Sequence, residues 1–133
     1  MFEFFAPLPE NRADNLNPVT LAFVGDAVWS LYVRQKFSLE ADYTSGVLQK
    51  MTSAEVSAHG QNVYLKGVEE EFTPHEADIF RRGRNAKKPS HSKNADISEY
   101  NNSTGFEAVL GWLYLTGKSD RLLYLMSRGV GNN

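Results

Sequence analysis

The chain has 133 residues, of which 41% are hydrophobic and 23% charged, so it is long enough for one folded domain and too apolar to be disordered throughout. It contains no cysteine, which excludes disulfide bonds, thiolate metal ligands and cysteine nucleophiles. The net charge of −2 does not by itself indicate a nucleic-acid partner, and we expect neither a secretory signal nor a membrane-spanning segment.

The spacing of apolar residues predicts helices along the chain and gives no convincing strand. After a lead of residues 1–16, Asn17 and Pro18 are typical of a helix start, with Asn as the N-cap and Pro in the first turn. The segment 18–37 is apolar at three- and four-residue spacing and also on its other faces, through residues such as Phe23. This pattern predicts a buried central helix.

A second helical region is expected from about residue 45 to residue 63, with Ser53 as a cap or a break. Further along, Thr73 and Glu76 form a capping-box pattern with a proline in the first turn. This pattern predicts the start of a helix that runs towards Arg84.

The polar segment 84–96 is expected to be an exposed basic loop. Another strongly periodic helix follows and ends near Gly117, and Ser119 is expected to cap a short last helix that stops at Gly129. The sequence therefore predicts an all-α fold in a single domain, residues 1–133.

Two acidic residues stand in apolar helical segments, each near a glycine. Asp26 follows Gly25, and Glu107 lies one helical turn before Gly111. A carboxylate among apolar residues loses solvation unless it meets a cationic side chain, hydrogen-bond donors or a metal ion. By position alone, Asp26 is better explained as a partly exposed acid paired with Lys or Arg, but two such acids beside glycines also fit a shared site.

The chemistry of that site would follow from its oxygen ligands. Carboxylates without cysteine or suitably spaced histidine ligands favour a hard cation, Mg²⁺ or Mn²⁺. Two acids on crossing helices could hold such an ion, and without it they would repel each other and raise one pKa.

Basic residues are concentrated in one part of this acidic chain. The segment 79–95 has no Asp or Glu and contains six cationic side chains, namely Arg81, Arg82, Arg84, Lys87, Lys88 and Lys93. They predict a surface that binds phosphates. Cations at a solvated helix end would explain Arg81 and Arg82 equally well, but not the three lysines.

Several segments resemble a known family. Segment 23–28 (FVGDAV) resembles the signature helix of the ribonuclease III catalytic domain, and segment 106–111 (FEAVLG) resembles the second acidic helix of that fold. Further segments are similar to its compact bacterial branch, Mini-ribonuclease III: 81–87 (RRGRNAK), 93–96 (KNAD) and Ser103-Thr104. The similarity is collinear over roughly residues 17–128.

The resemblance implies a ribonuclease III-like helical bundle that acts as a homodimer and cleaves double-stranded RNA. It implies Mg²⁺ as the cofactor, with Mn²⁺ as a substitute, and Asp26 and Glu107 as the catalytic metal ligands. The implied substrate is the large-subunit (23S) ribosomal RNA precursor in the cytoplasm, cut to give 5′-phosphate ends, with no organic cofactor and no membrane partner. The residues expected to contact RNA are Arg81, Arg82, Arg84, Asn85, Lys87, Lys88, Lys93 and Asp96.

The sequence departs from full-length ribonuclease III at acidic positions. Ala22 and Thr104 occupy two of them, and a third aligns near Ser45. We therefore expect waters and RNA phosphates to complete the metal coordination.

Two other functions fit the sequence without the resemblance. One is a non-catalytic helical dimer that binds structured RNA through the basic face, and the other is a helical adaptor for protein partners. Incubation with structured RNA, in Mg²⁺ or in EDTA, distinguishes all three.

Overall fold

The computed structural model describes residues 3–88 and 96–128, and in these residues the secondary structure is entirely helical. The elements in chain order are α1 (Glu10–Asp14), α2 (Pro18–Glu40), α3 (Ser45–Val56), α4 (Ala58–Val68), the short 3₁₀ helix η1 (Glu69–Glu71), α5 (Pro74–Asn85), α6 (Ile97–Leu115) and α7 (Ser119–Ser127). The predicted all-α class is confirmed.

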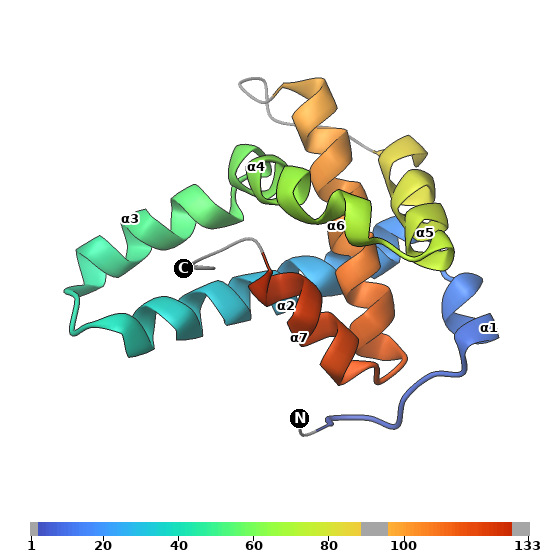
Figure 1. Cartoon of the computed structure of the whole chain (residues 1–133), viewed down its shortest axis with the longest axis horizontal. Helices are drawn as coiled ribbons and strands as arrows, with labels where there is room; N and C mark the ends of the chain where they lie inside the picture. Colours follow the sequence, from blue (N-terminus) through green and yellow to red (C-terminus); the bar gives the residue numbers. More distant parts are fainter. Residues whose placement is uncertain (1–2, 89–95, 129–133) are drawn as a thin grey trace.

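Helix α6 runs through the middle of the molecule, and α2, α4, α5 and α7 pack around it (Figure 1). Its buried residues include Phe106, Leu110 and Leu113, which belong to the same hydrophobic core as Trp29 of α2. The ring of Trp29 packs edge-on against Phe106, with 5.4 Å between ring centroids. The core therefore centres on the packing of α2 against α6.

Two glycines allow α2 and α6 to cross at backbone contact. A Cβ atom on Gly25 would lie 1.7 Å from the carbonyl oxygen of Glu107, and one on Gly111 would lie 1.9 Å from that of Leu21. No side chain fits at either point, so glycine is required for this close approach. Asp26 follows Gly25 directly, so the same crossing brings Asp26 next to Glu107.

Most of the predicted helix ends are confirmed. The Asn17 side chain accepts a hydrogen bond from the Val19 amide, and Thr73 and Glu76 form the complete capping box. The chain leaves α6 through Gly117, whose φ of 75° suits glycine.

Other predicted boundaries are wrong. The second helical region breaks at Ser57 rather than Ser53, because the extended Ser57 ends α3 and caps α4 through its side chain. Lys118, not Ser119, is the N-cap of α7 and makes no side-chain cap bond. Helix α1 lies within the predicted lead, and Arg84 belongs to α5 rather than to the basic loop.

One side of α2 is not covered by the rest of the chain, so the prediction of a buried helix is wrong for that side. Trp29 is fully buried, but Phe23 is 80% exposed and Leu31 is 66% exposed, with Ala27 exposed between them. These three residues lie four positions apart along the helix and form one apolar strip. No helix in residues 3–88 or 96–128 is long and apolar enough to cross a membrane.

A buried ion pair joins α5 to α7. Arg121 of α7 donates from Nε and Nη2 to the two carboxylate oxygens of Glu76, each at 2.8 Å, and the Thr73 amide donates to Glu76 at 2.9 Å. Burial acts to raise the pKa of Glu76, but the bonds from Arg121 and Thr73 outweigh it and hold the pKa below its usual value. The charged form of Glu76 therefore stabilises the fold.

This pair predicts a pH-dependent stability. A lowered carboxyl pKa gives stability that is fully present above the usual Glu range and is lost as the pH falls through the lowered value. Glu76→Gln should lower the free energy of unfolding by about 1–3 kcal/mol at pH 7, because it replaces a charged hydrogen-bond acceptor. The difference from wild type should shrink as the pH falls below about 4.3, the usual Glu pKa. Denaturant titrations from pH 7 to pH 3 measure this, with Glu10→Gln as a control at an exposed ion pair. A constant difference across this range would contradict the prediction.

The glycine crossing predicts opposite effects for two glycine-to-alanine changes. Gly25→Ala forces a methyl group into the Glu107 backbone and should destabilise the protein by about 1–3 kcal/mol or more. Gly67→Ala in α4 is the control, since nothing lies within 4 Å of its added Cβ and alanine favours helix by about 0.4–1 kcal/mol. Thermal and denaturant unfolding measure both variants, and equal effects would mean that the crossing tolerates a side chain.

Candidate active site

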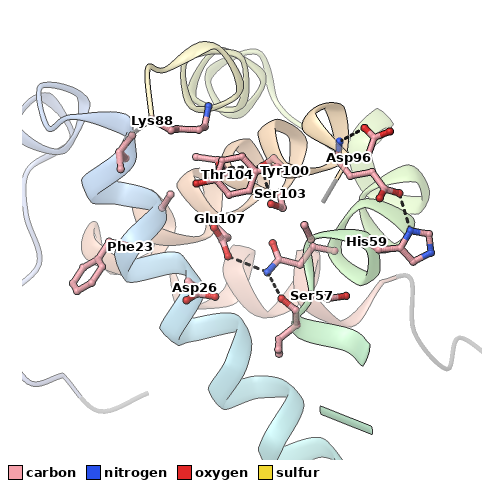
Figure 2. A pocket seen from close by; sticks show the side chains of 16 residues that line it. Phe23, Asp26, Ser57, His59, Lys88, Asp96, Tyr100, Ser103, Thr104 and Glu107 are labelled. Atoms are coloured by element: carbon pink, nitrogen blue, oxygen red, sulfur yellow. Dashed lines mark hydrogen bonds and ion pairs between the residues drawn. The ribbon is translucent and has the colours of Figure 1, made fainter. Parts of the chain in front are cut away.

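Asp26 and Glu107 face each other where α2 crosses α6 (Figure 2). Asp26 is exposed and Glu107 is half-buried, so Asp26 lies on the solvent side of the pair. In the described part of the chain, Asp26 makes no ion pair with Lys or Arg, which argues against the positional explanation of this residue. The two carboxyl groups are instead each other's neighbours.

The proximity of the two acids changes the protonation of Glu107. Burial raises the pKa of Glu107 to about 8, and the neighbouring Asp26 carboxyl group adds to this effect. A hydrogen bond from Gln61 acts in the opposite direction. Burial and the nearby Asp26 therefore both favour the protonated form of Glu107, in agreement with the predicted rise of one pKa when no cation is bound.

Gln61 is a site residue that the sequence did not reveal. Its Nε2 donates to Glu107 Oε2 at 2.9 Å and to the carbonyl oxygen of Val56 at 3.0 Å, and the residue is only 1% exposed. A single glutamine in the first turn of a helix forms no recognisable motif. Its role becomes visible only when α4 packs against α6.

A cavity of about 680 Å³ opens over the two acids. Its walls come from α2, the α3–α4 corner, α6 and the residues just after α5. They include Phe23, Ser57, His59, Lys88, Tyr100 and Ser103 (Figure 2). Ala22 and Thr104 also line it, so the two positions for which the resemblance implies an acid in full-length ribonuclease III have non-acidic side chains here. In residues 3–88 and 96–128, no group of three His, Cys, Asp or Glu side chains is arranged to hold a metal.

Two of the predicted RNA contacts lie at this cavity. Lys88 donates from Nζ to the carbonyl oxygens of Arg84 at 3.1 Å and Ala86 at 2.8 Å, and burial lowers its pKa. Asp96 is the N-cap of α6 and accepts a hydrogen bond from the Glu99 amide at 3.1 Å. A lysine and a further acid therefore line the same cavity as Asp26 and Glu107.

The other predicted RNA contacts within the described residues do not line the cavity. Arg81 pairs with Asp78, and Arg82 donates to the backbone oxygen of Asp14 at 2.8 Å, so both have partners within the fold. Arg84 lies over the ring of Phe80. Asn85 and Lys87 are exposed at and just beyond the end of α5, whereas Lys93 lies outside the described residues.

Comparison with known proteins supports the predicted family. Residues 19–118 match the ribonuclease III domain family. The chain is 41% identical over 125 residues to Mini-ribonuclease 3 of Staphylococcus aureus, covering 90% of this chain and 93% of that protein. It is 40% identical over 116 residues to Mini-ribonuclease 3 of a Thermoanaerobacter species, covering 87% and 82%.

The fold is also similar to a solved structure. A crystal structure of a Fusobacterium nucleatum protein matches with a TM-score of 0.76 at 28% identity, over 84% of this chain and 89% of that one. Ribonuclease III enzymes cleave double-stranded RNA in a metal-dependent reaction, and the matched region contains both Asp26 and Glu107. The chain therefore belongs to the ribonuclease III family and is an endoribonuclease of its Mini-ribonuclease 3 group.

Proposed function

We propose that Asp26 and Glu107 are the catalytic metal ligands of this endoribonuclease and that they hold Mg²⁺, with Mn²⁺ as a substitute. The observation that carries the proposal is the crossing at Gly25 and Gly111, which sets two carboxylates from different helices against each other in an open cavity. The proposed substrate is the double-stranded region of the large-subunit (23S) ribosomal RNA precursor, which places the activity in the cytoplasm.

The donor chemistry of the site fits this cofactor. Mg²⁺ is commonly held by one or two carboxylates, with waters and substrate phosphate in the remaining positions. Asp26 and Glu107 supply the carboxylates, and Ala22 and Thr104 supply no further acid. RNA phosphates and waters would then complete the coordination.

When bound, the cation lowers the pKa of the attacking water and offsets negative charge on the phosphate. Asp26 and Glu107 would fix its place, while Lys88 lines the same cavity and would neutralise an RNA phosphate there. Hydrolysis joins the water oxygen to phosphorus and breaks the bond between phosphorus and O3′. The products are a 5′-phosphate and a 3′-hydroxyl.

The proposed RNA-binding surface extends from the cavity along the end of α5. Lys88 and Asp96 would contact RNA next to the acids, and further contacts would lie outside the cavity: Arg81, Arg82, Arg84, Asn85 and Lys87. Lys93, outside the described residues, is also proposed to contact RNA. The family's duplex substrate is recognised mainly by its shape, phosphates and 2′-hydroxyls, which suits a basic surface of this kind.

Removal of either acid tests the metal site. Asp26→Asn and Glu107→Gln keep the side-chain shape but remove the charge that binds a cation, so each should reduce cleavage by about a hundredfold or more. The assay follows a labelled duplex RNA with Mg²⁺ and with EDTA. Asp120→Asn, at an exposed acid of α7, is the matched control and should cleave normally. Near-normal cleavage by either site variant would show that the ligands are assigned wrongly.

We further propose that the exposed apolar strip of α2 packs against a second copy of the chain. Phe23 both belongs to this strip and lines the cavity, so the strip is continuous with the site. Phe23 and Leu31 are large apolar side chains that gain stability when covered. A homodimer related by twofold symmetry would bury two such strips and present two active sites to one duplex.

The dimer can be tested at the edge of this strip. Leu31→Glu places a charge in the proposed interface and should convert the dimer to a monomer. Leu123→Glu is the control, because Leu123 is 54% exposed on α7 and is not part of the strip. Sedimentation analysis gives the mass in solution. A wild-type monomer, or a Leu31→Glu protein that stays dimeric, would exclude this interface.

A further inference from the structure

The side-chain amide of Gln61 has only one possible orientation. Its NH₂ group contacts the Val56 carbonyl at 3.0 Å and Glu107 Oε2 at 2.9 Å. The Val56 carbonyl can only accept, so the NH₂ group must face it, because an amide oxygen in that place would meet another acceptor. Each amide hydrogen has one partner, and one of these partners is the candidate metal ligand.

This arrangement leaves the other half of the amide unsatisfied. Gln61 Oε1 is buried and has no hydrogen-bond partner among the described residues. A buried acceptor without a partner costs free energy, so a methionine of similar length would be easier to accommodate here. Packing in the core therefore does not explain why an amide stands at this position. The hydrogen bond to Glu107 is the contact that connects it to the candidate site.

The Val56 end of this bridge is held by a rigid corner between α3 and α4. Trp29 donates from its indole nitrogen to the carbonyl oxygen of Glu55 at 3.2 Å, next to Val56. Across the corner, a Cβ atom on Gly60 would lie 2.1 Å from the carbonyl oxygen of Ala54, so the two helices meet at backbone contact. The Gln61 amide is thus anchored to the Val56 carbonyl oxygen, which the corner between α3 and α4 holds in place.

We propose that Gln61 is a positioning residue, which uses its bridge from Val56 to hold the Glu107 carboxylate in the orientation that shares a cation with Asp26. The inference rests on the proposed function, since it assumes that these two acids are the ligands. Groups that orient a metal ligand commonly change metal affinity when they are replaced. Gln61 would act through Glu107 and would not touch the RNA or the cation.

A purely structural role for Gln61 makes a different prediction. If the amide only braced the α3–α4 corner, its loss would change the stability of the folded protein and leave the cation affinity as it was. If the amide positions Glu107, its loss weakens cation binding in protein that is still folded. Cation affinity measured without RNA separates these two roles, because it does not depend on catalytic turnover.

The experiment is a titration of Mn²⁺ into the purified full-length protein, with free Mn²⁺ followed by electron paramagnetic resonance. Gln61→Met keeps the side-chain length and removes both hydrogen bonds, and it should weaken Mn²⁺ binding by about 10–100-fold. Excess Mg²⁺ should recover part of its cleavage activity. If Gln61→Met does not fold, Gln61→Asn keeps an amide that is one methylene too short to bridge Val56 and Glu107.

Asn62→Leu is the matched control. Asn62 is a buried amide at the next position of α4, and its bonds go to Glu99 and Asn102 rather than to Glu107. Its replacement should leave Mn²⁺ affinity unchanged in the folded protein. Equal weakening in the Asn62 and Gln61 variants would overturn the inference, because the effect would then come from a general loosening of α4.

Asp26→Asn distinguishes failure of this inference from failure of the proposed function. If Asp26→Asn abolishes saturable Mn²⁺ binding while Gln61→Met binds as wild type does, the positioning role is wrong and the metal site stands. If wild type shows no binding that depends on Asp26, the metal site itself is wrong and the positioning role fails with it. Weaker binding by Gln61→Met, with binding lost in Asp26→Asn and normal in Asn62→Leu, supports both.

Discussion

The backbone contact between α2 and α6 is the constraint on which the rest of the structure depends. Gly25 and Gly111 remove the side chains that would separate the helices, and the axes then come close enough for backbone atoms to touch. The core and the candidate site are consequences of the same contact. Trp29 packs against Phe106 on one side of the crossing, and Asp26 meets Glu107 on the other. This close packing fixes the backbone positions of the two acids relative to each other.

Local sequence signals were sufficient wherever a few adjacent residues determine the structure. The N-cap at Asn17 and the capping box at Thr73 satisfy amides within their own first turn, and both were predictable. The break between α3 and α4 was not, because Ser53 and Ser57 are equally suitable caps by sequence. The choice depends on the packing of Gly60 against the backbone of α3, which is visible only in three dimensions.

The site shows the same division between local motifs and tertiary contacts. Asp26 and Glu107 could be picked out because the residues beside them form motifs. Gln61 could not, because its bond to Glu107 spans 46 positions and depends on how α4 meets α6. Charge alone also did not show which contacts the basic residues make within the fold. Arg82 bonds to the backbone of Asp14, whose side chain accepts from the Trp112 indole, so this arginine helps to hold α1 against the core.

The non-acidic walls at Ala22 and Thr104 have a thermodynamic consequence for the proposed enzyme. A cation whose coordination is completed by RNA phosphate binds more tightly when RNA is present, and by linkage the RNA binds more tightly when the cation is present. The two ligands would then load the site cooperatively. The cation concentration needed for half-maximal cleavage would fall as the RNA concentration rises. Without RNA, the protein would bind little metal and would hydrolyse few other phosphodiesters. Because Ala22 and Thr104 supply no carboxylate, the RNA substrate itself would be needed to complete the cation site at which it is cut.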